Sequence, residues 1–329
     1  MTSTSPPLGS GPFSRTVVTV GNFDGVHLGH RAILSRVLAR AQELECQPVV
    51  LTFDPHPLKV LNPQTHLRLL TTPAQKVELL KSLGLSVVVV SFSREFAAIP
   101  ARKFVQDYFW ERLRAREIVV GHDYRFGHKR EGNIELLKEM GQALGFTVQV
   151  VWAVEMEGAV VSSSLIRAML RLGKVPEANR LLGRDYGVLG QVVAGKGRGA
   201  KLLGVPTANL APENDLLPAS GIYAVWVQRD GEMLPGVANI GTCPTFDNQE
   251  LSLEVHLLDF NGDLYGERLQ VDFVTRLREE RRFQSIDDLA EQIRADVQEA
   301  RRELAEGSKF KVKPAAYCQE RSTMCTLNS

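Results

Sequence analysis

The sequence predicts an α/β fold in two parts: a doubly wound parallel-sheet domain, followed by a small antiparallel β-barrel domain with a C-terminal helix. In the first half, uniformly apolar runs alternate with helical segments, as in a parallel sheet covered on both faces. From residue 186 the strand-like runs become short and closely spaced, without helices between them. The length of 329 residues suits two domains. We predict domains at 15–185 and 186–306, with flexible tails at 1–14 and 307–329.

Five apolar runs mark the strands of the first domain. A helix follows the first run, because apolar side chains recur at helical spacing between residues 30 and 44 and indicate one buried face. We expect this helix to begin near His30. The predicted strands are Thr16–Val20, 48–53, 86–92, 117–121 and 146–152.

The second domain shows five short runs with turn residues between them, which is typical of an antiparallel barrel. A final helix follows, with Ser285 placed to cap it and Asp288 three residues on. The predicted barrel strands are 187–194, 222–229, 234–240, 251–258 and 268–275.

Composition and charge argue against several classes of protein. Lys and Arg number 39 and Asp and Glu 38, so no overall charge favours nucleic acid or an anionic membrane. No apolar run approaches the roughly 20 residues of a membrane span, and the first fifteen residues lack the apolar core of a secretory signal. The four cysteines form no CxxC pair. We expect a cytoplasmic protein with reduced thiols and with no membrane or nucleic-acid partner.

The densest motif, GNFDGVHLGH at 21–30, lies between the first strand and the first helix. This is the carboxyl end of a strand, where open α/β sheets bind ligands. The glycines allow close approach to a phosphate, and the helix adds the positive end of its dipole. His27 and His30 are three apart, so both imidazoles can face a phosphate that gains charge during transfer.

Two other interpretations of these histidines stay open. They can simply cap the helix, which is a structural role. They can also bind a metal with Asp54 or His56, although the sequence has no cysteine or third histidine at the usual spacing.

Two further motifs follow predicted strands. FDPHP at 53–57 holds His56 and Pro57 in a rigid turn, which suits either a pocket wall or a plain turn. GHDYRFG at 121–127 combines Asp123 with an arginine and two aromatic residues, a set that can hold a planar ring or form an ordinary surface turn.

Three consecutive serines, 162–164, open another predicted helix, and Arg167 lies about one turn later. One serine is enough for an N-cap. The additional hydroxyls of Ser163 and Ser164, together with the arginine, therefore favour phosphate binding.

Residues 195–209, GKGRGAKLLGVPTAN, are rich in glycine and basic. Alternating glycines let backbone amides close on phosphates, whereas the Gly-x4-Gly-Lys-Ser/Thr order of a P-loop is absent. Thr207 and Asn209 offer uncharged oxygens for a partly hydrated Mg²⁺, and a plain flexible loop is the alternative. The candidate nucleotide-binding residues here are Gly197, Gly199, Lys201, Gly204, Thr207 and Asn209.

Glu254 lies in the predicted strand LSLEVHLL, on the same face as Ser252 and His256. A carboxylate aimed into the mouth of a barrel is a general-base candidate. A carboxylate aimed at water is an ordinary surface acid, and both interpretations stay open.

Taken in order, these motifs resemble the bacterial bifunctional riboflavin kinase/FMN adenylyltransferases, or FAD synthetases. The resemblance runs from about Arg15 to Glu306 and includes NIGTCPTF and LREERRF in the second half. It implies a nucleotidyltransferase-like first domain and a kinase barrel. The barrel would phosphorylate riboflavin with ATP and Mg²⁺, and the first domain would adenylylate FMN to FAD with release of pyrophosphate. The implied partners are therefore riboflavin, FMN and ATP, and a homo-oligomer is compatible with the sequence.

The resemblance also implies residue roles. Glu254 would be the kinase base, with Thr207 and Asn209 holding Mg-ATP, and Arg278 on the flavin side together with His56 and Pro57. In the first domain His27 and His30 would steady the reacting phosphates. The nucleotide would be held by Gly21, Phe23, Gly29, Asp123, Ser163, Ser164 and Arg167.

Three positions depart from the family pattern. Ser164 stands where threonine is usual, Val160 lies in a segment that commonly carries a basic residue, and Cys243 replaces an arginine. Three alternative functions fit part of the chain. They are a nucleotidyltransferase for another phosphorylated acceptor, a nucleotide-binding regulator without catalysis, and an aminoacyl-tRNA synthetase with a similar histidine motif.

Overall fold

The computed structural model describes residues 13–194, 207–244 and 249–306. The chain packs into two compact units. The sheet unit comprises the residues up to Leu67 and Pro73–Val161, and the barrel unit comprises Arg68–Thr72 and the residues from Ser162 onward. Packing therefore assigns residues 162–185 to the barrel unit, and the predicted boundary between functions at 185/186 stays a prediction.

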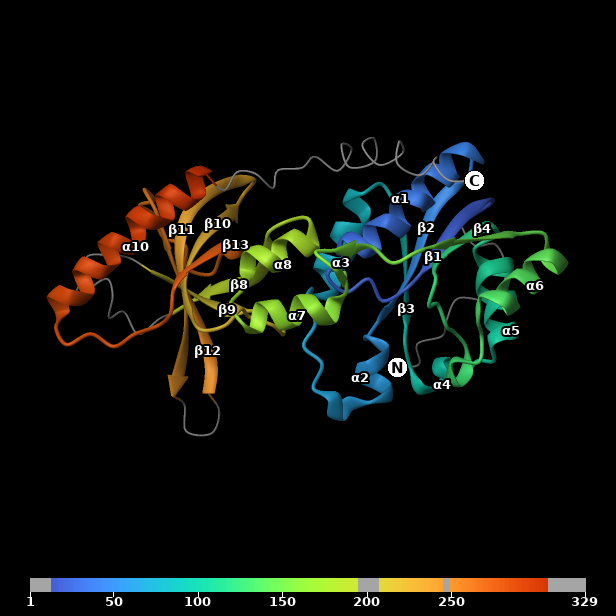
Figure 1. Ribbon diagram of the computed structural model, residues 1–329, viewed down its shortest axis with the longest axis horizontal. Coiled ribbons are helices and arrows are strands. Elements are labelled where there is room, and N and C mark those ends of the chain that lie inside the picture. Colours follow the sequence, from blue (N-terminus) through green and yellow to red (C-terminus); the bar gives the residue numbers. More distant parts are fainter. Residues whose placement is uncertain (1–12, 195–206, 245–248, 307–329) are drawn as a thin grey trace. The chain divides into compact units, whose positions relative to one another are not determined.

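The sheet unit is built on five parallel strands in the order β3-β2-β1-β4-β5 (Figure 1). The strands agree with the predicted runs to within two residues at either end. They are β1 (Thr16–Val20), β2 (Gln47–Asp54), β3 (Ser86–Ser91), β4 (Ala115–Gly121) and β5 (Thr147–Val151). A two-stranded hairpin of β6 (Glu155–Met156) and β7 (Ala159–Val160) follows β5.

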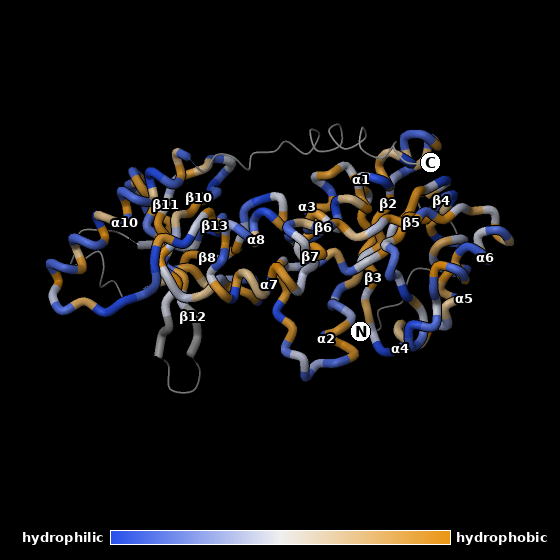
Figure 2. Tube along the Cα trace, viewed as in Figure 1, coloured by the Kyte–Doolittle hydropathy of each residue, from blue (hydrophilic) through white to orange (hydrophobic). Residues whose placement is uncertain are grey.

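Helices cover both faces of this sheet, which confirms the doubly wound prediction. Adjacent strand residues point to opposite faces, so Val17 packs in one core with Leu34 and Leu80, while Val18 packs in the other with Phe109 and Leu137. Figure 2 shows the hydrophobic residues gathered along the strands between the helices. The helices are α1 (Leu28–Glu43), α2 (Pro57–Leu61), α3 (Pro73–Ser82), α4 (Arg94–Ala97), α5 (Ala101–Phe104), η2 (Val105–Arg112) and α6 (Ile134–Leu144), with single turns η1 (Pro63–Thr65) and η3 (His128–Arg130).

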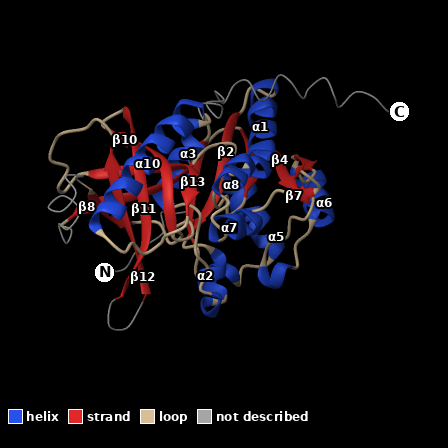
Figure 3. Ribbon diagram, turned by 60° about the vertical axis from the view of Figure 1, so that its left-hand side comes forward, coloured by secondary structure: helices blue, strands red, loops and turns tan. Residues whose placement is uncertain are grey.

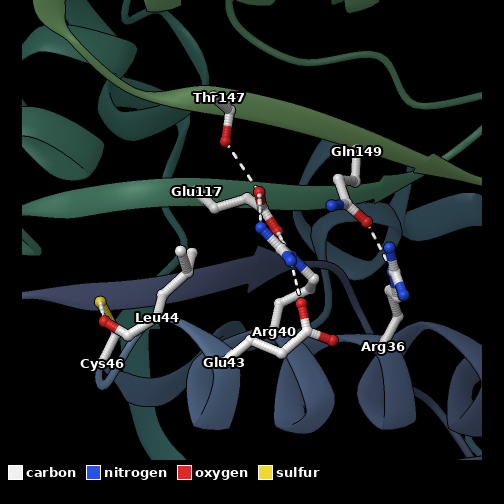
Figure 4. Close-up of polar contacts among 8 residues, drawn as sticks. All are labelled: Arg36, Arg40, Glu43, Leu44, Cys46, Glu117, Thr147 and Gln149. Carbon is white, nitrogen blue, oxygen red and sulfur yellow. Dashed lines mark hydrogen bonds and ion pairs between the residues drawn. The ribbon is translucent and has the colours of Figure 1, made fainter.

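A buried ion pair fixes α1 against the sheet (Figure 4). Arg40 donates two hydrogen bonds to the Glu117 carboxylate, at 2.7 and 3.1 Å, and Thr147 on β5 donates a third at 2.8 Å. Burial by itself would raise the pKa of the Glu117 carboxyl, but the hydrogen bonds from Arg40 and Thr147 outweigh it and hold that pKa below its usual value. The C-terminal half of α1 is thereby fastened to β4 and β5.

Six strands of the barrel unit close into a barrel in the order β10-β11-β12-β9-β8-β13. Five of them confirm the predicted runs. The sixth, β9, was not predicted, because its Ala208 and Asn209 lie in a segment whose glycines and prolines indicated a loop. The strands are β8 (Tyr186–Val193), β9 (Ala208–Pro212), β10 (Gly221–Arg229), β11 (Glu232–Pro244), β12 (Gln249–Leu257) and β13 (Arg268–Arg278).

The helix α10 (Ile286–Glu306) packs on the outer face of β10, β11 and β13 (Figure 3). Ser285 caps it as predicted, because its hydroxyl accepts from the backbone N–H of Asp288 at 3.1 Å. Its Ala300 and Leu304 are buried beside Ala224 of β10. None of the helices that the structure describes combines the length and apolar character needed to cross a bilayer.

Two helices before the barrel, α7 (Ser163–Arg171) and α8 (Val175–Leu182), also belong to the barrel unit. The buried Asn179 of α8 donates to the Phe273 carbonyl at 2.7 Å and to Asp185 at 2.9 Å, and it accepts from the Tyr186 N–H at 2.9 Å. One carboxamide therefore joins the helix to β8 and β13.

A cluster of two carboxylates accompanies this junction. Asp272 is buried and accepts from Gln228 at 2.6 Å and from Gln270 at 2.8 Å. Burial, reinforced by the nearby charge of Asp272, raises the pKa of the Asp185 carboxyl to about 6. Because the folded-state pKa is raised, the contribution to stability is present below about pH 4 and is lost as pH rises through about 6.

We predict that Asp185→Asn stabilises the protein at pH 8, by roughly 1–2 kcal/mol after allowance for partial exposure. The variant removes the unfavourable charge and keeps the oxygen that accepts from Asn179. Denaturant unfolding should show a smaller gain at pH 5 than at pH 8. The exposed Asp230→Asn is the matched control, and an equal effect of both variants at both pH values would contradict the prediction.

We also predict that Glu117→Gln lowers the free energy of unfolding by roughly 1–3 kcal/mol, because it leaves the Arg40 guanidinium without its buried counter-charge. Glu139→Gln is the control, since the Arg102–Glu139 pair is exposed on both sides and is expected to contribute less than about 1 kcal/mol. Chemical denaturation of both variants should separate them. Equal losses would mean that the Glu117 pair does not fasten α1.

Candidate functional site

The loop between β1 and α1 is backbone-strained. Phe23 and Val26 are not glycine, yet their φ angles are +50° and +41°. Such left-handed conformations cost about 1–3 kcal/mol each and persist only where the surroundings enforce them. Both side chains are buried in the sheet unit, which supplies that enforcement.

The two histidines of this loop lie together. The imidazole rings of His27 and His30 are stacked with centroids 3.6 Å apart, and the ring of Phe23 meets His30 edge-on at 5.1 Å. A Cβ on Gly29 would lie 3.2 Å from the His27 ring and 3.2 Å from the Val161 carbonyl, so a larger residue would crowd the His27 ring. The structure thus brings the predicted His27, His30, Phe23 and Gly29 together.

The start of α1 agrees with the prediction to within two residues. The helix begins at Leu28, and His27 is its N-cap, with Nδ1 accepting from the His30 N–H at 3.3 Å. No acidic residue occupies the first turn. Arg31 follows in the same turn, and its Nε is buried without a hydrogen-bond partner in the described part of the chain. Burial lowers the pKa of this guanidinium.

The loop lies at the point where the strand order reverses, because the chain adds β2 and β3 on one side of β1 and then β4 and β5 on the other. β1 is flanked by β2 on one side and by β4 on the other, and ligands of open α/β sheets bind in the crevice at such a point. The predicted Gly21 directly follows β1, and the predicted Asp123 is exposed just after β4. Beside it, His122 stacks on the exposed Trp152 that follows β5, with ring centroids 5.7 Å apart.

A buried lysine, which sequence reasoning missed, lies near the same loop. Lys76 of α3 donates to the Phe53 carbonyl at 2.8 Å. Burial lowers the pKa of its ammonium, while the charges of Asp54 and Asp24 oppose that shift. A lysine in the middle of a helix that packs on the sheet was the available signal, but only the fold shows that it faces inward.

His56 serves as a helix cap in the structure. It is buried, and its Nδ1 accepts from the Leu58 N–H at 3.1 Å, while Pro57 begins α2. The structural interpretation of this turn is therefore confirmed. Whether His56 and Pro57 also contact flavin stays a prediction.

The serine segment caps a helix of the barrel unit. Ser162 accepts from the Leu165 N–H at 3.3 Å, so one serine is the N-cap, and Ser163 and Ser164 occupy the first turn of α7. Arg167 is buried on the same helix. These three predicted phosphate-binding residues thus belong to the barrel unit, whereas His27, His30 and Asp123 belong to the sheet unit.

In the barrel, one row of residues follows the strand register across neighbouring strands. Arg278 on β13 lies opposite Ile222 on β10, and Ile222 lies opposite Asn239 on β11. Asn239 in turn lies opposite Glu254 on β12, and Glu254 lies opposite Asn209 on β9. Directly opposite residues of antiparallel strands share a face, with Cβ atoms about 4.5–5.5 Å apart. The row therefore brings together three residues predicted separately.

The face of this row is the outer one. Leu253 and Val255, on either side of Glu254, are fully buried in the barrel interior. Glu254 consequently points away from the interior and is half-buried. The sequence left open whether Glu254 points into the barrel or into water. In the structure its carboxylate lies outside the barrel interior and is only partly exposed.

Asn209, at one end of the row, lines a cavity of about 290 Å³. Thr207 and Asn209 line it on one side, and the loop from Phe260 to Tyr265 lines it on the other. The predicted Gly197, Gly199, Lys201 and Gly204 lie outside the described residues, as does the side chain of Cys243.

Arg278 is held by α10. Its guanidinium forms a bidentate ion pair with the buried Asp296, with N–O distances of 2.8 and 2.7 Å, and Gln292 donates to the same carboxylate at 2.7 Å. The predicted flavin-side arginine is therefore rigidly placed, although sequence reasoning did not identify its partner.

The donor chemistry fits one of the two metal predictions. Among the residues described, no three His, Cys, Asp or Glu side chains cluster as a metal site would require, so nothing supports the alternative of a metal on His27 and His30. Thr207 and Asn209 instead bring two uncharged oxygen donors to the cavity lining, and Glu254 lies opposite Asn209 on the neighbouring strand. This set suits Mg²⁺, which binds few protein oxygens and keeps several waters.

Comparison with known proteins gives a consistent result. A family model described as FAD synthetase matches residues 12–165, and one described as riboflavin kinase matches residues 182–304. The bifunctional riboflavin kinase/FMN adenylyltransferase of Pseudomonas fluorescens is 41% identical over 286 residues, which are 87% of this chain and 92% of that one. The protein of the same name from Escherichia coli K12 is 39% identical over 296 residues, 89% and 94% of the two chains.

A solved structure is also similar. It is described as a macrolide-efflux protein from Streptococcus pneumoniae, and it matches with a TM-score of 0.82 at 34% identity, over 89% of this chain and 95% of that one.

Proposed function

The chain belongs to the bifunctional riboflavin kinase/FMN adenylyltransferases, and from this family membership we propose which of its residues carry each reaction. The enzyme phosphorylates riboflavin to FMN and adenylylates FMN to FAD, with ATP as co-substrate of both steps. The proposals concern the residue roles, the metal and the boundary at 185/186 between the two activities.

Glu254 is the general base of the kinase reaction. The terminal ribityl hydroxyl forms a bond to the γ-phosphorus of ATP, the bond from that phosphorus to ADP breaks, and the hydroxyl proton passes to the Glu254 carboxylate. The observation that carries this role is the register, which sets a half-buried carboxylate directly opposite Asn209 at the cavity edge. Arg278, fixed by Asp296, supports the flavin side of the site.

Thr207 and Asn209 would hold Mg²⁺ together with the ATP phosphates. When bound, the ion neutralises charge that accumulates on the transferring phosphoryl group. Gly197, Gly199, Gly204 and Lys201 would bind the same phosphates through backbone amides and an ammonium.

His27 and His30 stabilise the phosphates during adenylyl transfer. A phosphate oxygen of FMN attacks the α-phosphorus of ATP, and pyrophosphate leaves. The stacked imidazoles stand at the positive end of α1, with Arg31 in the first turn of the helix and no acidic residue in that turn, which favours developing negative charge. Ser163, Ser164 and Arg167 keep their predicted role in holding phosphates, and Asp123 keeps its predicted role in binding the nucleotide.

Other expectations stay predictions. They are the flavin contacts of His56 and Pro57, a cytoplasmic location, the homo-oligomeric state and the absence of membrane and nucleic-acid partners.

We predict that Glu254→Gln lowers riboflavin phosphorylation by about 10²–10⁴-fold, because glutamine keeps the size and polarity of the side chain but cannot take the proton. The same preparation, supplied with FMN, should make FAD at a rate within a few-fold of wild type, since that step uses other residues. Chromatography of the flavins measures both rates.

The exposed Glu232→Gln on β11 is the control for this experiment and should leave both rates unchanged. Kinase turnover of Glu254→Gln within a few-fold of wild type would remove this residue from the mechanism. Loss of both activities would indicate misfolding.

The reciprocal prediction concerns His30→Ala. FAD formation from FMN should fall by about 10²–10³-fold, as is typical when one stabiliser of developing charge is removed, while FMN formation should persist. His66→Asn, at an exposed turn with positive φ, is the control. Unchanged FAD synthesis by folded His30→Ala would leave the histidine with a structural role only.

A further inference from the structure

A buried oxygen on β11 lacks a hydrogen-bond partner. Asn239 lies directly opposite Glu254, and its Oδ1 accepts no hydrogen bond from the described part of the chain. A buried acceptor without a donor costs about 1–3 kcal/mol and is uncommon in folded proteins. The position therefore needs a physical explanation.

The neighbours of Asn239 in the row cannot supply the missing donor. On one side lies Ile222, which is apolar and buried. On the other side lies Glu254, which as a carboxylate only accepts hydrogen bonds. Two acceptors thus stand side by side on the outer face of the barrel, at the cross-strand spacing of about 5 Å. A ligand that fits them must bring two adjacent donors.

We propose that Asn239 binds the ribityl hydroxyl next to the one that is phosphorylated, and so positions the reacting hydroxyl against Glu254. This inference rests on the proposed role of Glu254. A polyol carries hydroxyl groups on neighbouring carbons, so the terminal hydroxyl faces the carboxylate while its neighbour donates to Asn239 Oδ1. Asn239 is a positioning residue, since the proton goes to Glu254.

The geometry also gives Asn239 a part in substrate selection. A site built to hydrogen-bond a substrate hydroxyl discriminates against an analogue that lacks it, because the buried acceptor is then left unpaired. The analogue to test is 4′-deoxyriboflavin, in which only the hydroxyl next to the terminal one is missing. The readout is the ratio of kcat/KM for riboflavin to that for the analogue.

We expect the kcat/KM of wild-type enzyme to be about 5–50-fold higher for riboflavin than for the analogue, which corresponds to the loss of one buried hydrogen bond. Asn239→Leu keeps the size of the side chain but removes the acceptor, and it should lower the ratio to about 1. Asn239→Asp keeps the acceptor, so its ratio should stay close to that of wild type even if repulsion by Glu254 lowers both rates. Gln191→Leu, which removes an exposed carboxamide from β8, is the matched control and should keep the wild-type ratio.

Two results would overturn the proposal: a wild-type ratio near 1, or an Asn239→Leu ratio equal to that of wild type. If Asn239→Leu does not fold, Asn239→Ala carries the same comparison. Glu254→Gln, measured in parallel, tests the role of Glu254 as the base separately from the role of Asn239 in positioning. If that variant loses turnover while Asn239→Leu keeps the ratio, Glu254 remains the base and the role of Asn239 is wrong. If Glu254→Gln retains turnover, the proposed base fails whatever the ratio shows.

Discussion

The kinase site depends on the register of the closed barrel. Side chains alternate between the two faces of a strand, so a slip of one residue would move Glu254 into the interior and expose Leu253 and Val255. Those two residues are fully buried, as is Ala238 opposite Val255 on β11. The burial of apolar side chains therefore fixes where the polar row lies. The hydrophobic core, rather than any contact among the polar residues, brings Asn209, Glu254 and Asn239 together.

The sheet unit positions its site differently, through one helix. The Arg40–Glu117 pair fastens the C-terminal half of α1, and the packing of Leu34 and Val37 on the sheet fixes its axis. The N-terminus of the helix is then placed at the end of β1. The left-handed residues Phe23 and Val26 are tolerated because their buried side chains leave the loop no alternative path. The packing of α1 on the sheet and the burial of Phe23 and Val26 together fix the position of the loop.

The buried carboxylates differ in the neighbouring groups that offset the cost of their burial. Glu117 and Asp296 each meet an arginine and further donors, which offset the cost of burial. Asp272 accepts from two amides and is favoured by the charge of Arg184, yet burial still raises the pKa of its carboxyl, and its charge opposes that of Asp185. The junction of α8 with the barrel is thus held by the carboxamide of Asn179, while the carboxylates beside it weaken the fold at neutral pH. The two carboxylates that position α1 and Arg278 thus each form an ion pair with an arginine.

By itself, the sequence determined the elements and the chemistry of the individual motifs. The period of two or of 3.6 residues located ten strands and the helices α1, α7 and α10, and the histidines, the serine cap and Glu254 were identified from residue type and spacing. These are local properties, set by neighbours in the chain. The strand β9 was missed because turn residues adjoin it, and pairing with β8 and β12 outweighs their local preference. Only the tertiary structure decided that Glu254 stands on the outer face between two asparagines, that Arg278 is bound to Asp296, and that Lys76 faces inward. Each of these facts joins residues far apart in the sequence, and no local pattern encodes which distant strand or helix will lie opposite.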